Sequence, residues 1–173
     1  TRVKKNMSKQ KYNGIWFYGI SGSGKTSASN YLKKKIKKSI IIDGDEVRKL
    51  ISFDLGYSLS EREIQIKRVF GFAKLAIRSD IFPILSTVFM NKNIMSKARK
   101  EKILLIKILR DFKKIKDLKN VYKNNNKNII GKDIQIPRLK SELKIENNSS
   151  ISVFKEKIYK LIWDRNILII PFL

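Results

Sequence analysis

The segment that most constrains the fold of this chain is Gly19-Ile20-Ser21-Gly22-Ser23-Gly24-Lys25-Thr26. A short apolar run, residues 14–18, precedes it and predicts a buried strand that enters a glycine-rich turn. Residues 26–38 have helix-forming composition, with apolar side chains at Ala28, Tyr31, Leu32 and Ile36. We therefore expect a strand–loop–helix unit at this point in the chain.

The glycine spacing in this loop predicts a phosphate-binding site. Glycines allow the backbone to turn tightly and to point its N–H groups inward, where they and the following helix N-terminus bind phosphates. In this pattern Lys25 bridges the β- and γ-phosphates of ATP, and the Thr26 hydroxyl ligates Mg²⁺. A chance match is the alternative, but the strand and the helix lie where the motif requires them. The expected ATP-binding residues are Gly19, Ser21, Gly22, Ser23, Gly24, Lys25, Thr26 and Ser27.

The remaining chain alternates between predicted strands and predicted helices. Strands are predicted at 39–42, 81–86, 103–108 and 143–146, and helices at 46–53, 61–77, 95–101 and 150–164. This alternation predicts an α/β fold in three layers, with a five-stranded, mostly parallel sheet between helices. We place the start of the 61–77 helix at a Ser60–Glu63 capping box. The last helix is expected to face the core with Val153, Ile158, Leu161 and Ile162.

Composition limits the chemistry and the partners. The chain has no cysteine and no histidine, so acid–base groups must be carboxylates, Lys or Tyr. The net charge of +24 suggests nucleic acid. However, 30 Lys and 9 Arg occur together with 28 Ile and 13 Asn, which indicates A/T-rich codon usage and disfavours that partner. No apolar run approaches the roughly 20 residues of a membrane span, so we expect a cytoplasmic protein without membrane contact.

The domain organisation is simple. Residues 1–13 are basic and polar, and they are interpreted as an N-terminal extension that is disordered or partly vector-derived, with Met7 as a candidate start. Residues 14–173 are expected to form a single domain. Within it, residues 113–132 are rich in Lys and Asn and predict a basic loop.

A second motif, Asp43-Gly44-Asp45, follows the predicted strand at 39–42. Ligands of open α/β sheets bind at the carboxyl ends of the strands, so these carboxylates would face the γ-phosphate. One could hold a magnesium-bound water, and the other could accept a proton from an attacking hydroxyl. The alternative is an Asp-Gly turn with a helix N-cap.

Arginines and a tyrosine downstream are candidates for binding a second substrate. The guanidinium groups of Arg48, Arg62 and Arg68 suit phosphate or sulfate oxygens, and Tyr57 could stack on a nucleobase. The alternatives are a solvated helix face for the arginines and ordinary packing for the tyrosine.

Taken together, these segments resemble the adenylyl-sulfate (APS) kinase family across residues 15–164. The similarity lies in residues 19–27, 43–48, 55–58, 61–62, 67–68 and 117–123. The family transfers the γ-phosphoryl group of ATP to the ribose 3′-hydroxyl of a nucleotide that bears a sulfated phosphate.

The resemblance implies a role for each matching residue within a P-loop kinase domain. Asp45 would be the base or hydroxyl-positioning residue, and Asp43 would organise Mg²⁺ together with Thr26. Arg48 and Arg62 would hold the phosphate-linked end of the acceptor, and Tyr57 would stack on its base. Lys119 and Lys123 would belong to a lid at about 113–133 that excludes water. Pairing is common in this family, which makes a homodimer a candidate assembly.

Several positions depart from the family pattern, and they lie on the acceptor side. Glu46 and Gln65 each replace an Asn, Ile129 replaces a stacking Phe, and residues 87–90 replace Phe-Ile-Ser-Pro. We expect Gln65, Lys119 and Ile129 to contact the acceptor. The departures favour cytidine diphosphoramidate, the acceptor of a related kinase in bacterial capsule biosynthesis, with adenylyl sulfate as the alternative. A polynucleotide kinase is a more remote alternative, and intact Lys25 and Asp45 disfavour an inactive ATP-binding switch.

Overall fold

The computed structural model describes residues 11–115, 130, 134, 143–164 and 168–169. Its centre is a five-stranded sheet of order β3-β4-β2-β5-β6, in which every neighbouring pair is parallel. The predicted sheet is therefore confirmed. Its strands are β2 Gly14–Tyr18, β3 Ser39–Asp43, β4 Phe82–Thr87, β5 Ile103–Leu109 and β6 Leu143–Glu146.

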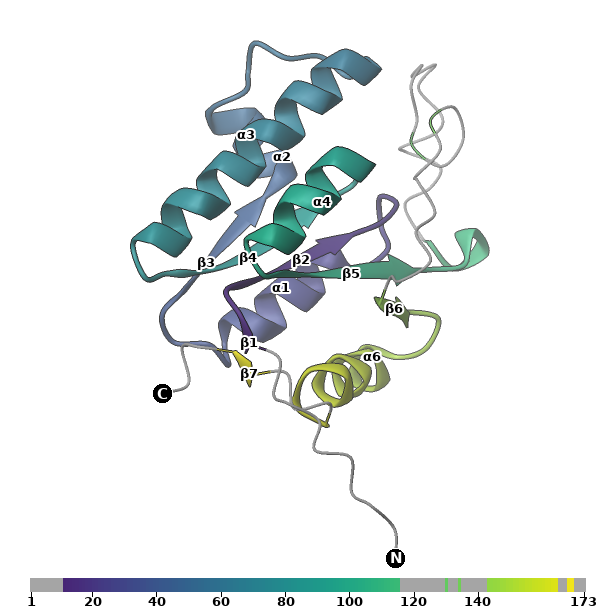
Figure 1. Cartoon of the computed structure of the whole chain (residues 1–173). Helices are drawn as coiled ribbons and strands as arrows, with labels where there is room; N and C mark the ends of the chain where they lie inside the picture. The colour runs from purple at the N-terminus through teal and green to yellow at the C-terminus, as the bar shows by residue number, and fades with distance from the viewer. Residues whose placement is uncertain (1–10, 116–129, 131–133, 135–142, 165–167, 170–173) are drawn as a thin grey trace, which may run out of the picture.

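Helices cover both faces of the sheet, as Figure 1 shows. One face packs against α2 Gly44–Leu50, α3 Leu59–Arg78 and α4 Lys92–Lys100, and the other against α1 Lys25–Lys33 and α6 Ile151–Tyr159. The central strand β2 shows why. Trp16 and Tyr18 belong to the first core cluster, whereas Ile15 and Phe17 belong to the second. Alternation of buried side chains in a strand buried on both faces gives three layers.

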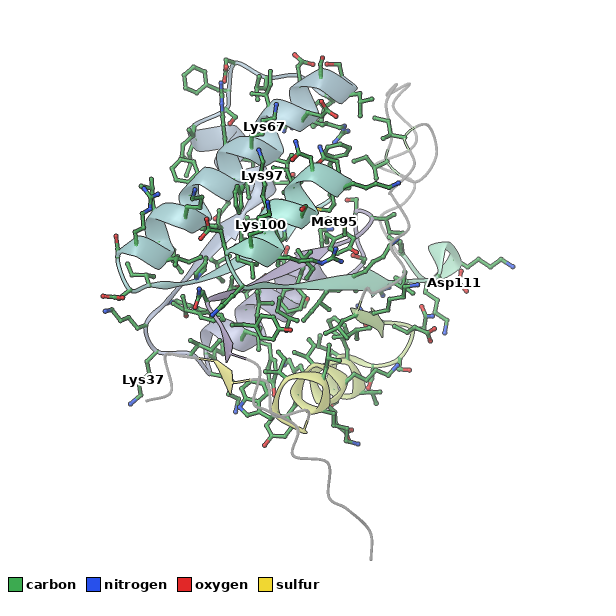
Figure 2. The ribbon with its side chains drawn as sticks, in the orientation of Figure 1. Lys37, Lys67, Met95, Lys97, Lys100 and Asp111 are labelled. Carbon is green, nitrogen blue, oxygen red and sulfur yellow. The ribbon has the colours of Figure 1, made fainter. Side chains whose placement is uncertain are left out.

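The outer face of α4 Lys92–Lys100 is basic. On α4, Met95 is buried, whereas Lys97 and Lys100 lie exposed (Figure 2). No helix in the described part of the chain has the length and apolar composition that spanning a bilayer requires.

The start of α3 differs from the prediction. The helix begins at Leu59, and its capping box consists of Ser58 and Glu61 rather than Ser60 and Glu63. Glu61 also accepts the backbone N–H of Gly56 at 2.8 Å, so the preceding turn and the helix start share one carboxylate. Both serine–glutamate pairs have the required spacing in the sequence, and the contact with Gly56 selects the first.

The C-terminal helix also differs from the prediction. It begins after the N-cap Ser150 as expected, but α6 ends at Tyr159 and continues as a π-helical segment, η2 Lys160–Asp164. Val153 is 39% exposed, so its predicted place in the core is wrong. Phe154 is buried instead, because the stripe facing the sheet is Phe154, Ile158 and Ile162, four residues apart.

Two short strands lie outside the main sheet. β1 Lys11–Tyr12 pairs in parallel with β7 Leu168–Ile169, which joins the two ends of the described chain. This pairing has no signal in the sequence, since each strand contains only two residues. Residues 1–10 of the predicted N-terminal extension lie outside the described residues.

Candidate active site

The phosphate-binding loop leaves the carboxyl end of the central strand and enters α1. Gly19 and Gly24 have φ angles of 151° and 105°, which favour glycine. A larger side chain would also not fit at these two positions. A Cβ atom on Gly19 would lie 2.4 Å from the Ile108 carbonyl oxygen, and one on Gly24 would lie 2.3 Å from Asn147 Nδ2. The loop is thus held tightly between the ends of β5 and β6.

Lys25 is folded back over this loop. Its Nζ donates a hydrogen bond to the Ile20 carbonyl oxygen at 2.8 Å, and its side chain is 8% exposed. Burial lowers the pKa of Lys25 to about 8, although Asp45 and Asp43 oppose the change. A bound anion would favour the charged form of Lys25. The predicted contact with phosphates would therefore offset the cost of burying this charge.

Asp43 is both a helix cap and a residue of the cavity. Its Oδ1 accepts the backbone N–H groups of Asp45 at 2.9 Å and Glu46 at 3.4 Å, and its Oδ2 accepts the Ser86 hydroxyl. The N-cap alternative is therefore correct as a description of the backbone. It does not remove Asp43 from the site, because a carboxylate has about four lone-pair positions and these bonds fix its orientation.

A cavity of about 310 Å³ brings the two motifs together. Asp43 and Asp45 line it together with Lys25 and Thr26, and with Ser86, Thr87 and Val88 at and just after the end of β4. Arg110, which sequence reasoning missed, lines it as well. Its signal was available, since Arg110 lies two residues after the predicted strand at 103–108, whose carboxyl end would adjoin the loop.

The donor groups in this cavity fit Mg²⁺. Thr26 and Asp43 offer a hydroxyl and a carboxylate, the oxygen ligands that this ion prefers. The described part of the chain holds no cluster of three or more acidic or histidine side chains. Phosphate oxygens and water would therefore complete the coordination, as is usual for Mg²⁺ bound with a nucleotide.

A second, smaller cavity of about 50 Å³ adjoins the first. It is lined by the predicted acceptor residues Arg48, Tyr57, Arg62 and Gln65, and it shares Gly44, Asp45, Thr87 and Val88 with the first cavity. Asp45 is exposed, and its side chain makes no hydrogen bond to another described residue. The structure thus places this carboxylate between the two cavities.

The ring of Tyr57 contacts both arginines. Its centroid lies 4.5 Å from Arg48 Cζ and 5.2 Å from Arg62 Cζ. Arg48 Nη1 also donates to the carbonyl oxygens of Leu55 and Gly56, and Arg62 Nε donates to that of Tyr57 at 2.9 Å. Burial, followed by the nearby charge of Arg48, lowers the pKa of Arg62. The arginines therefore shape the tyrosine loop and bring positive charge to the second cavity.

The other predicted site residues have three outcomes: one lies at the site, one lies away from it, and the rest lie outside the described residues. Gln65 is buried, and its Nε2 donates to the Gly44 carbonyl oxygen at 2.9 Å, which ties α3 to the Asp43–Asp45 turn. Arg68 pairs with Asp54 at 2.6 Å and lines neither cavity. Lys119, Lys123 and Ile129 lie outside the described residues, as does most of the predicted 113–133 lid.

Comparison with known proteins identifies the family of the chain. Residues 11–135 match the family model for adenylylsulphate kinase. The chain is 28% identical to an adenylyl-sulfate kinase from Buchnera aphidicola of Schizaphis graminum, over 99% of this chain and 89% of that protein. It is 34% identical to one from Clostridium acetobutylicum, over 60% of this chain and 55% of that protein.

The fold has solved counterparts. The chain resembles the Mycobacterium tuberculosis APS kinase solved in complex with AMPPNP and APS, with a TM-score of 0.76 and 22% identity over 87% of this chain and 97% of that one. The family model covers well over half of the sequence. The chain therefore belongs to the adenylylsulphate kinase family of ATP-dependent phosphotransferases.

Proposed function

We propose that the chain transfers the γ-phosphoryl group of Mg-ATP to the ribose 3′-hydroxyl of adenylyl sulfate. The observation that supports this most is the position of Asp45, which lines both the cavity of the phosphate loop and the cavity of the arginines. Phosphoryl transfer requires an acceptor hydroxyl in line with the γ-phosphate, beside a group that positions it. A carboxylate that lines both cavities could position this hydroxyl, and this supports Asp45 in that role.

On the donor side, the loop N–H groups and the α1 N-terminus would bind the phosphates. Lys25 would leave the Ile20 carbonyl and bridge the β- and γ-phosphates. Thr26 and Asp43 would hold Mg²⁺, which neutralises charge on the phosphates when it is bound. Asp45 would orient the 3′-hydroxyl and accept its proton as the bond to phosphorus forms.

On the acceptor side, Arg48 and Arg62 would hold the anionic end of the nucleotide, since guanidinium groups match phosphate and sulfate oxygens. Tyr57, which is 56% exposed, offers a ring face for the base. Gln65 would contact the acceptor beside Asp45. Lys119 and Ile129 stay predictions, as does the homodimer.

Adenylyl sulfate replaces cytidine diphosphoramidate as the leading acceptor. The sequence departures favour the cytidine compound, but the two relatives described above are named as adenylyl-sulfate kinases. The observation that keeps cytidine diphosphoramidate as a second candidate is Ile129, which stands where the family has a stacking Phe.

The acceptor can be determined directly. The purified chain would be incubated with Mg-ATP and either adenylyl sulfate or cytidine diphosphoramidate, and the 3′-phosphorylated product would be identified by mass spectrometry. We expect a higher kcat/KM for adenylyl sulfate. A higher value for the cytidine compound would reverse the acceptor assignment, and no transfer to either despite ATP binding would refute the proposed function.

A further inference from the structure

Arg110 occupies a distinctive place beside the phosphate loop. It directly follows β5, the strand whose Ile108 carbonyl packs against Gly19 at the start of the loop. Its side chain lines the same cavity as Lys25 and Thr26. Within the part of this cavity that the structure describes, Arg110 and Lys25 are the cationic side chains.

The hydrogen bonds of Arg110 leave part of its guanidinium group unused. Nη1 donates to the Gly22 carbonyl oxygen at 3.3 Å, and Nη2 donates to the Lys114 carbonyl oxygen at 3.1 Å. Nε is buried and has no partner among the described residues. A guanidinium group has five N–H donors, and a buried donor without a partner is costly. The guanidinium group can therefore donate a hydrogen bond to a further anionic or polar partner.

No carboxylate among the described residues pairs with this guanidinium group. The nearest acidic residue in sequence, Asp111, lies beyond the end of β5 beside η1 Phe112–Lys114 (Figure 2). Its carboxylate accepts the backbone N–H of Lys113 at 3.0 Å. Arg110 thus forms no ion pair with a described residue, and its positive charge stays available in a cavity that Asp43 and Asp45 also line.

We propose that Arg110 is a further binding residue for the polyphosphate of the donor nucleotide, acting beside Lys25. Its planar fork suits phosphate oxygens, and the long bond to Gly22 is the contact that a phosphate oxygen would replace most readily. Arg110 would therefore add a second positive charge beside Lys25 in the cavity of the phosphate loop.

A purely structural role is the alternative. Asn147 shows what such a role looks like, since its buried side chain donates to the Ser23 carbonyl oxygen at 2.8 Å and carries no charge. Arg110 could likewise only hold the loop through Gly22. The two roles differ in one measurable way, because a charge that contacts phosphate makes binding depend on salt concentration, whereas a loop brace does not.

The test is the affinity of the intact protein for Mg-ATP, Mg-ADP and adenosine, measured by titration calorimetry and NMR over a range of salt concentrations. We expect Arg110→Gln to weaken binding of both phosphorylated nucleotides by about 10- to 100-fold. Its dissociation constant should depend less on salt than that of the wild type, and adenosine binding should be unchanged. Arg110→Lys should recover part of the loss, since it keeps the charge without the fork.

Arg78→Gln is the matched control, because Arg78 is exposed at the end of α3 and lines neither cavity. Unchanged Mg-ATP affinity in Arg110→Gln would overturn the proposal. So would an equal loss for adenosine with the salt dependence of the wild type. The inference rests on the ATP side of the proposed function, and these titrations contain no acceptor. A wrong acceptor assignment would therefore leave their outcome unaffected.

Discussion

Asp45 and Glu46 are neighbouring exposed carboxylates with different surroundings. Asp45 lines both cavities of the site, whereas Glu46 lines neither. Asp45 is also the residue whose backbone N–H binds the fixed carboxylate of Asp43, so its place relative to the phosphate loop is defined by the backbone. The backbone thus fixes the position of Asp45, and its carboxylate, which makes no hydrogen bond to another described residue, is free to bind a hydroxyl.

Asp45→Asn should therefore lower kcat by about 100-fold or more, the usual contribution of a positioned general base. The dissociation constant for Mg-ATP should stay within a few-fold of the wild type, because the phosphate loop is unchanged. Steady-state kinetics and calorimetry measure the two quantities. Glu46→Gln, which removes the same charge one residue away, should leave kcat nearly unchanged. Parallel loss of transfer and ATP binding in Asp45→Asn would contradict the assigned role.

At the scale of elements, the turn before α3 is held by the helix cap that stabilises α3, and it carries a residue of the second cavity. Glu61 binds Gly56 and Ser58, and Arg48 binds Leu55 and Gly56, so one short turn is held from two helices. Tyr57 lies in the middle of this turn. The capping box therefore supports the ring that would contact the acceptor.

Ser58→Ala should destabilise the protein by about 1 kcal/mol, since it removes the N-cap of a long helix. Ser60→Ala is the matched control, because Ser60 lies in the first turn and does not cap it. We expect its cost to be below about 0.5 kcal/mol, as for an ordinary surface change. Denaturant unfolding gives both values. A larger loss in Ser60→Ala would favour the capping box predicted from the sequence alone.

The sequence predicted those elements whose signals are local. The glycine loop, the five strands and the Asp43–Asp45 turn depend on neighbouring residues, and the structure confirms the strands and the loop. The sequence could not decide whether Ser58 or Ser60 is the N-cap of α3, because the contact between Glu61 and Gly56 selects Ser58. Nor could it exclude Val153 from the core, since the orientation of α6 depends on packing. The position of Arg110 after a strand was a signal for the site, but its contact with Gly22 joins residues that are far apart in the chain and is visible only in the structure.

At the scale of the whole molecule, Lys25 links stability to pH. Its pKa is about 8 in the folded protein and near 10.4 in an unfolded chain, so the unfolded state binds more protons between these values. Stability due to this group therefore rises as the pH increases from 8 towards 10. Below pH 8 both states are charged, and the burial of the charge has its full destabilising effect.

Lys25→Met should consequently stabilise the empty protein by about 3 kcal/mol at pH 7, and the gain should shrink towards pH 10. Thermal or urea unfolding of both proteins across this range gives the difference, in which the many exposed lysines cancel. Lys37→Met, at an exposed lysine far from the loop (Figure 2), should show no such trend. A gain that grew with pH would contradict the sign of the argument.

The position of β2 at the centre of the sheet has a consequence for synthesis of the protein. Ile15 pairs with Ile84 on one side and with Leu104 on the other, although the phosphate loop follows β2 almost at once. A nascent chain on the ribosome therefore contains the whole loop sequence long before either neighbouring strand has emerged. Gly19 contacts both neighbouring strands, since its backbone N–H donates to the Thr87 carbonyl oxygen at 3.3 Å and its Cα side faces the Ile108 carbonyl oxygen. The nucleotide site is thus encoded early and assembled late, and we expect the loop to reach its final geometry only after β5 has left the exit tunnel and joined the sheet.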